Sequence, residues 1–99
     1  MKGYLLTQPA ATDLDEILDY IASQNAQTAV RVATRFAALF DRISQTPGIG
    51  HPRDELRDAA LRVVTEAGYL VVYDQTLTPL HILRVVRGSR DLRRITPRP

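Results

Sequence analysis

The chain has 99 residues, of which 44% are hydrophobic and 24% charged, and its formal net charge is only +2. These values are typical of one folded domain, here residues 1–99, and they exclude a disordered chain. Cysteine is absent and the two histidines lie far apart, so we expect no disulfide, no metal site and no other cofactor. No apolar run approaches ~18 residues and no signal segment is visible, so we expect a cytoplasmic protein that does not contact membranes.

The chain begins with segments that predict a short strand followed by an amphipathic helix. Residues 3–7 are typical of a strand, and Thr7 is a plausible N-cap with Pro9 in the first helical turn. Apolar residues then recur at helical spacing, and acidic residues occupy the other face. We therefore predict a helix over residues 9–23 with an acidic exterior.

A second helix is predicted over residues 26–45, because an apolar stripe continues there and its arginines face away from that stripe. Asn25 can end the first helix or cap the second, which leaves a link of only a few residues. Such a short link forces the two helices into an antiparallel hairpin. The pair Pro47-Gly48 ends the second helix.

The second half of the chain predicts a polar connector and three strands. The connector covers residues 47–59, and β-like segments follow at residues 61–65, 69–74 and 80–87, with links short enough for hairpins. The order is β-α-α-β-β-β. We predict an α+β fold of two layers, with the helical hairpin packed on one face of a mainly antiparallel sheet.

The other face of the sheet is predicted to be open, because no further helix is available to cover it. Residues 69–73 are apolar on both sides of the strand, which a fully solvated face would not favour. We therefore expect this open face to be a partner surface.

Arginines are concentrated at the end of the last predicted strand. Six of them lie between Arg84 and Arg98, against a single acid. Guanidinium groups are always charged and bind planar anions through paired hydrogen bonds, so the cluster predicts an acidic partner, either a carboxylate-rich protein or a phosphate backbone. The candidate partner-binding residues are Arg84, Arg87, Arg90, Asp91, Arg93 and Arg94.

Structural alternatives exist for several members of this cluster. Alternation with Ile82 and Val86 places Arg84 on one sheet face, where it contacts a partner or forms an internal ion pair. Arg90 either anchors an acidic partner or pairs with Asp91 to order the tail. The later arginines are expected to be solvated until a partner binds, and such charges steer association more than they add affinity.

Outside this cluster, the polar residues of the connector region suggest structural roles. Arg62 is expected to hold the connector in place through one of its acids, Asp54, Glu55 or Asp58. His51 and His81 have no partner group in sequence that would suggest catalysis. Tyr69 and Tyr73 point to the same face and are expected to pack in the sheet.

Four short motifs occur in order along the chain. They are Ala10-x-x-Asp13-Leu14-x-x-Ile17-x-x-Tyr20-Ile21, Pro47-x-Ile49-Gly50-x-Pro52-Arg53-x-Glu55-Leu56, Tyr69-x-Val71-x-Tyr73 and Ile82-x-Arg84-Val85-x-Arg87-Gly88-x-Arg90-Asp91-Leu92. Through them, nearly the whole chain resembles the ParE/RelE toxin superfamily. The resemblance implies a toxin of a bacterial type II toxin–antitoxin module, neutralised by a small antitoxin whose C-terminal segment wraps across it, and a first strand beside the last.

The superfamily has two branches with different mechanisms. RelE-like members cleave messenger RNA on the ribosome, with lysines on the strand after the connector and a tyrosine or a His-Tyr pair in the tail, whereas ParE-like members inhibit DNA gyrase. Here residues 61–65 contain no lysine, and residues 92–99 contain no tyrosine, histidine or glutamate. Arg87 stands where the family often has histidine and cannot release its proton near neutral pH. The resemblance therefore implies the ParE-like branch, with no catalytic residue.

The partners that this resemblance implies are a cognate antitoxin, ParD-like with a ribbon-helix-helix or similar fold, and DNA gyrase. Two alternatives stay open: a ribosome-dependent mRNA endonuclease that uses arginines alone, and a non-toxic binding module of the same fold. We expect no sequence-specific DNA binding by this chain, because it lacks a recognition-helix signature and aromatic residues between its basic ones.

Overall fold

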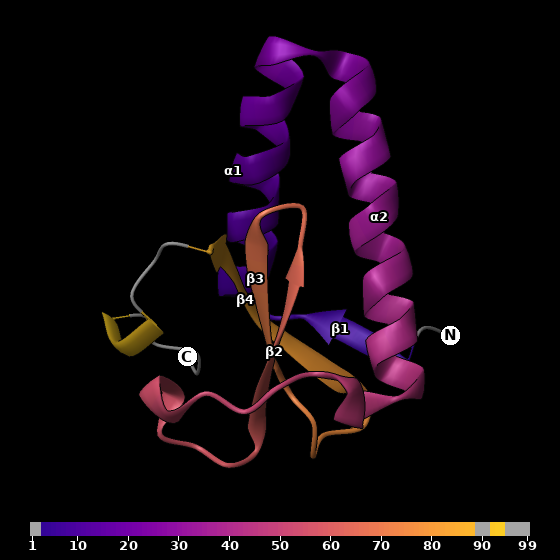
Figure 1. The fold of residues 1–99 in the computed structure, drawn as a ribbon. Helices are drawn as coiled ribbons and strands as arrows, with labels where there is room; N and C mark the ends of the chain where they lie inside the picture. Colours follow the sequence, from indigo (N-terminus) through magenta and orange to yellow (C-terminus); the bar gives the residue numbers. More distant parts are fainter. Residues whose placement is uncertain (1–2, 89–91, 95–99) are drawn as a thin grey trace.

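The computed structural model describes residues 3–88 and 92–94. It contains two helices and a four-stranded sheet, which confirms the predicted α+β fold and its β-α-α-β-β-β order (Figure 1). The elements are β1 (Tyr4–Leu6), α1 (Gln8–Gln24), α2 (Ala26–Gln45), β2 (Leu61–Glu66), β3 (Tyr69–Asp74) and β4 (Leu80–Arg87). Three 3-10 turns lie at Pro47–Ile49, Asp54–Leu56 and Leu92–Arg94. Every helix and strand boundary lies within one residue of its prediction.

The strands are arranged in the order β1-β4-β3-β2. β1 is parallel to β4, with Tyr4 opposite Leu80, and the other two pairings are antiparallel. The first strand therefore lies beside the last, as the superfamily resemblance implied. The helical hairpin packs on one face of the sheet, and its closed end, where α1 meets α2, extends beyond the strands (Figure 1).

Two polar residues set the ends of the helices. The Thr7 side chain caps α1 by accepting a hydrogen bond from the backbone N–H of Ala10 (3.4 Å), and its hydroxyl donates to the carbonyls of Ile82 and Leu83 in β4. The Asn25 backbone N–H donates to Ile21 at the end of α1, and its side chain accepts from Thr28 N–H in α2 (3.0 Å). One asparagine thus ends the first helix and begins the second, which makes the hairpin tight.

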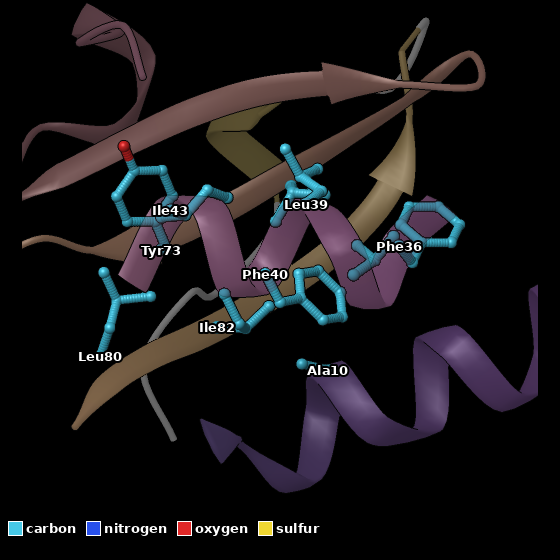
Figure 2. Packing of buried hydrophobic residues seen from close by; sticks show 10 residues of the cluster. Ala10, Phe36, Leu39, Phe40, Ile43, Tyr73, Leu80 and Ile82 are labelled. Atoms are coloured by element: carbon cyan, nitrogen blue, oxygen red, sulfur yellow. The ribbon is translucent and has the colours of Figure 1, made fainter. Parts of the chain in front are cut away.

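The main core lies between the hairpin and the sheet (Figure 2). Phe36, Phe40 and Ile43 of α2 are buried against Tyr73 and Ile82 of the sheet. The rings of Phe36 and Phe40 stack with their centroids 6.0 Å apart. Burial of each such side chain contributes roughly 2–3 kcal/mol, so this interface supplies most of the driving force that holds the two layers together.

The second face of the sheet is not open, contrary to the prediction. Leu70, Val72 and Leu83 on this face form a second buried cluster together with Leu56 of the connector and Leu92 after β4. Leu56 is 8% exposed and Leu92 only 2%. The apolar residues on both sides of β3 are therefore packed within the chain, and the connector covers this face of the sheet through Leu56.

The alternation predicted for β4 is interrupted by a bulge. Val72 of β3 is opposite Arg84 and Tyr73 is opposite Ile82, which leaves Leu83 without a partner on β3. A bulge of one residue shifts the side-chain alternation, so Ile82 packs in the core under the helices while Val86 belongs to the second cluster. The prediction that Arg84 shares one face with both was wrong for this reason.

The connector is held by a network of buried polar contacts. The Tyr73 hydroxyl donates to the Pro47 carbonyl (2.6 Å) and accepts from the Gly50 N–H (2.9 Å). Arg62 donates to the Gly50 carbonyl (3.0 Å) and to the Gln75 side chain (2.8 Å). Arg62 therefore holds the connector as predicted, but its partners are a backbone carbonyl and an amide, and not Asp54, Glu55 or Asp58.

Candidate functional site

The C-terminal end of β4 carries an exposed arginine in a fixed backbone. Arg87 is the last residue of this strand and lies opposite Tyr69 of β3. The next residue, Gly88, donates its backbone N–H to the Gly68 carbonyl in the β2–β3 turn (3.0 Å), and a Cβ at Gly88 would approach that carbonyl to 3.2 Å. The backbone on both sides of Arg87 is thus held while its guanidinium remains in solvent.

Arg84, three residues earlier, is engaged within the chain. Its guanidinium donates twice to the Asp13 carboxylate of α1, from Nε (2.6 Å) and from Nη2 (3.0 Å). The same carboxylate accepts the backbone N–H of Val85 (3.0 Å). Both side chains are largely buried, at 17% and 15% exposed, and the Asp13 hydrogen bonds raise the pKa of Arg84 above its ordinary range.

This ion pair closes the part of the β4 edge that β1 does not reach. β1 ends at Leu6, opposite Ile82, so beyond that point no strand of residues 3–88 or 92–94 pairs with β4 on this side. Asp13 satisfies the Val85 N–H there, as Thr7 satisfies the carbonyls of Ile82 and Leu83. The first two turns of α1 therefore fix the path of β4 just before it reaches Arg87.

A hollow of about 350 Å³ lies between α1 and the end of β4. Its lining residues are Asp13, Glu16, Ile17, Tyr20, Tyr69, Val85, Val86 and Arg87. A second hollow of about 390 Å³ adjoins it at the β2–β3 turn and is lined by Ala67, Gly68, Tyr69, Arg87 and Gly88. Because both hollows share Tyr69 and Arg87, these two residues stand at the centre of the concave surface.

The charges around the first hollow fall into two classes. Asp13 and Arg84 neutralise each other. Glu16 on α1 and Arg87 on β4 form no ion pair with any residue of the described ranges. The hollow thus presents one available carboxylate and one available guanidinium from two different elements.

Comparison with known proteins gives consistent matches over nearly the whole chain. The family model described as "ParE toxin of type II toxin-antitoxin system, parDE" matches residues 4–92. The chain belongs to the ParE toxin family. Toxin ParE1 of Caulobacter vibrioides is 31% identical over 94 residues, which cover 94% of this chain and 96% of that protein. Toxin ParE3 of the same organism is 28% identical over 93 residues, which cover 93% and 92% of the two chains.

A solved structure supports the fold of this ParE-family chain. The structure titled "Chromosomal ParDE TA system from P. aeruginosa" superposes with a TM-score of 0.72, covering 88% of this chain and 96% of that one. The sequence identity is 22%, so the likeness concerns the fold. The ParE family is defined by type II toxin–antitoxin systems, and membership implies an antitoxin partner.

The arginines predicted to bind a partner differ in their environment. Arg84 forms the internal ion pair that was its structural alternative, and Arg87 is exposed beside the hollows. Arg93 is exposed in the turn after β4 and lies near enough to Glu55 to help lower the pKa of that carboxyl, which the hydrogen bond from Arg53 lowers most. Arg94 belongs to the same turn.

Arg90 and Asp91 lie outside the described residues. The pairing predicted between them therefore stays a prediction, as does the partner contact predicted for the cluster as a whole.

Sequence reasoning missed the contribution of α1 to this site. Asp13, Glu16 and Tyr20 follow one another at helical spacing, and Tyr20 is 59% exposed although large aromatic side chains are usually buried. The spacing of these polar and aromatic residues was the signal that could have identified them. What sequence could not give is the position of α1 against the end of β4.

Residues 3–88 and 92–94 were also compared with the requirements of a metal site and of a membrane-spanning helix. No group of three potential His, Cys, Asp or Glu ligands occurs within these ranges. No helix of this part of the chain combines the length and apolar character needed to cross a membrane.

Proposed function

We propose that this ParE-family toxin inhibits DNA gyrase in the cytoplasm and is neutralised by a cognate antitoxin. Family membership supports the toxin and the antitoxin partner. The finer assignment rests on the arginine end of β4, whose residues Arg84, Arg87, Arg90, Asp91, Arg93 and Arg94 are proposed to serve the target or the antitoxin. Within this group Arg84 acts from inside the fold, by fixing the strand.

Arg87 is the observation that carries the proposal. It is exposed, it has no ion-pair partner in the described part of the chain, and its backbone is fixed by Asp13 on one side and Gly68 on the other. Because the backbone that carries Arg87 is already fixed, only its side-chain torsions have to be ordered when the guanidinium binds a carboxylate. This favours a docking function for the end of β4.

The histidines lie too far from Arg87 to act as acid or base on a substrate held there. His81 lies near the start of β4 and Arg87 at its end, which separates them by roughly 20 Å along an extended strand. His51 pairs with Val63 on the outer edge of β2, across the sheet from β4. Neither imidazole can exchange a proton with a substrate held at Arg87, because such transfer needs hydrogen-bond distance.

The proposed antitoxin is ParD-like, with a ribbon-helix-helix or similar DNA-binding part and a C-terminal arm that wraps across the toxin. Because the second sheet face is covered by Leu56 and Leu92, we place the arm on the helical hairpin and the arginine end. DNA binding by the module is assigned to the antitoxin, and this chain is proposed to make no sequence-specific contact with DNA.

A supercoiling assay tests the target. We expect the purified toxin to inhibit ATP-dependent supercoiling by DNA gyrase, and the Arg87→Glu variant to inhibit it less than Arg42→Glu, which reverses an exposed arginine at the far end of α2. Failure of the wild-type toxin to inhibit supercoiling would remove gyrase as the target. New cleavage ends on translated message, found by primer extension and lost in Arg90→Ala, would instead support the endonuclease alternative.

A further inference from the structure

The bulge in β4 decides on which face of the sheet Arg87 lies. Ile82, before the bulge, packs in the main core under the helices, and Arg87 comes five positions later. Because side chains of a regular strand alternate between faces, an uninterrupted β4 would put these two residues on opposite faces. The extra residue, Leu83, reverses this and moves Val86 to the second cluster. Arg87 therefore lies on the helix side, opposite Tyr69.

The beginning of α1 supplies hydrogen-bond partners to the backbone around this bulge. The Thr7 hydroxyl donates to the carbonyls of Ile82 (3.2 Å) and Leu83 (3.1 Å), and the Thr7 N–H also donates to Ile82 (3.1 Å). The Asp13 carboxylate accepts the N–H of Val85, two residues beyond the bulge (3.0 Å). A bulge disrupts the regular ladder, so it needs such partners for its backbone groups. Thr7 and Asp13 provide them from two successive turns.

Arg84 keeps the Asp13 carboxylate in place for this contact. Arg84 is opposite Val72, which belongs to the second cluster, yet its guanidinium reaches α1 and donates twice to Asp13. With the Val85 N–H, the carboxylate accepts three hydrogen bonds, and its side chain is only 15% exposed. Bidentate contacts of this kind fix the orientation of both groups. The alternation of β4 after the bulge is thus held by side chains that lie 71 positions apart in sequence.

We propose that Thr7 and Asp13 are positioning residues of this toxin: they hold the bulge and so keep Arg87 on the helix side of the sheet, where inhibition requires it. The inference rests on the inhibitory function proposed above for the arginine end of β4, and it adds the residues that set its orientation. Without the bulge, alternation would turn Arg87 to the face that Leu56 and Leu92 cover. Both positioning residues act through Arg87 and not by touching the target.

Nuclear magnetic resonance of the free toxin tests this placement without any partner. In the wild type we expect nuclear Overhauser contacts between the side chains of Arg87 and Tyr69, and slow exchange of the Val85 amide proton. Asp13→Ala removes the acceptor of that amide, so its exchange should become at least about tenfold faster, and the contact of Arg87 with Tyr69 should weaken. Gly50→Ala, which crowds a buried ring at the connector end, is the control and should preserve the contact.

Supercoiling by DNA gyrase tests the consequence for inhibition. Asp13→Ala should raise the toxin concentration needed for half-maximal inhibition by at least about tenfold, because the guanidinium is no longer held in one orientation. Gly50→Ala, which also lowers the free energy of unfolding, should change it by less than about threefold. A merely structural role of Asp13 would make variants of equal stability in urea inhibit equally.

The Thr7 contacts are tested by a conservative and a disruptive change. Thr7→Ser keeps the hydroxyl and should inhibit within about threefold of the wild type, whereas Thr7→Val loses both bonds to the bulge and should inhibit several-fold less. Thr7→Val also removes a helix cap. Asn25→Ala is the matched control for that loss, because it removes the side-chain cap of α2 at the far end of the hairpin.

The outcomes separate this inference from the proposed function. If Asp13→Ala inhibits as Gly50→Ala does, or keeps the contact between Arg87 and Tyr69, the inference is overturned. A wild-type toxin that arrests growth on induction but leaves gyrase unaffected would contradict only the target, and growth arrest then replaces supercoiling for the same variants. A wild-type toxin that does neither would contradict the proposed function, while the resonance data alone decide the placement. If Asp13→Ala does not fold, Asp13→Asn carries the same comparisons.

Discussion

The two ends of the sheet use their polar residues in opposite ways. At the connector end, the side chains of Tyr73 and Arg62 are hydrogen-bonded to the backbone of Gly50, and Tyr73 is also bonded to the Pro47 carbonyl. At the other end, Glu16 and Arg87 have no ion pair in the described ranges and border a hollow. Polar groups that are satisfied internally hold a fold together, whereas fixed but unpaired charges are available to a partner.

Asp13 lines the hollow, but its carboxylate is hydrogen-bonded within the chain. Replacing it should have the largest effect on the free energy of unfolding. The change Asp13→Asn removes the charge that pairs with Arg84 and weakens the bond to Val85 N–H. Breaking a buried pair costs about 3–5 kcal/mol, and partial exposure reduces this to about 2 kcal/mol here. Urea unfolding would measure it. Asp19→Asn, on the exposed face of α1, should change the free energy of unfolding by less than about 0.5 kcal/mol.

Glycine substitutions compare two positions in the connector. A Cβ at Gly50 would overlap the Tyr73 hydroxyl, whereas a Cβ at Gly48 would meet nothing within 4 Å. We expect Gly50→Ala to lower the free energy of unfolding by about 1–3 kcal/mol through crowding of the buried ring. Gly48→Ala should be close to neutral. Equal effects in chemical denaturation would show that the connector is not anchored by Tyr73.

The pH dependence of stability should report on the same tyrosine. Burial raises the pKa of Tyr73 above its ordinary value of 10.0, while the bond from Gly50 and the charge of Arg62 act in the opposite direction. The unfolded chain then releases this proton at a lower pH than the native protein. The stabilisation is complete below about pH 10 and is lost as the pH rises through the raised pKa.

Urea unfolding between pH 8 and pH 11 would test this, with Tyr73→Phe as the comparison. The variant should be less stable at pH 8 by about 1–2 kcal/mol, because the buried Gly50 N–H loses its acceptor. It should also lose less stability above pH 10 than the wild type. Parallel curves would contradict a raised pKa for Tyr73.

The fold was largely predictable because its signals are local. Helical spacing of apolar residues, the caps at Thr7 and Asn25, and the break at Pro47-Gly48 located both helices to within one residue. The β-like segments and their short links located the strands equally well. Each of these signals acts over a few residues and can be recognised without knowledge of contacts distant in sequence.

The site was predictable only in part, because it depends on contacts distant in sequence. Asp13 and Arg84 are 71 positions apart, and their pairing depends on the parallel register of β1 with β4. The bulge at Leu83 likewise has no local signature that alternation would reveal. The cover provided by Leu56 and Leu92 comes from single apolar side chains in otherwise polar segments, which no periodicity in the sequence reveals.

The most direct test of the central claim measures folding and binding on the same protein. In the double variant Arg87→Glu with Arg90→Glu, the free energy of unfolding should stay within about 1 kcal/mol of the wild type, because Arg87 is exposed and both arginines are assigned to partner binding and not to the fold. Its affinity for the antitoxin at low salt should fall by well over the roughly 1 kcal/mol expected for one exposed pair. An unchanged dissociation constant would contradict the claim that the arginine end of β4 is a docking surface.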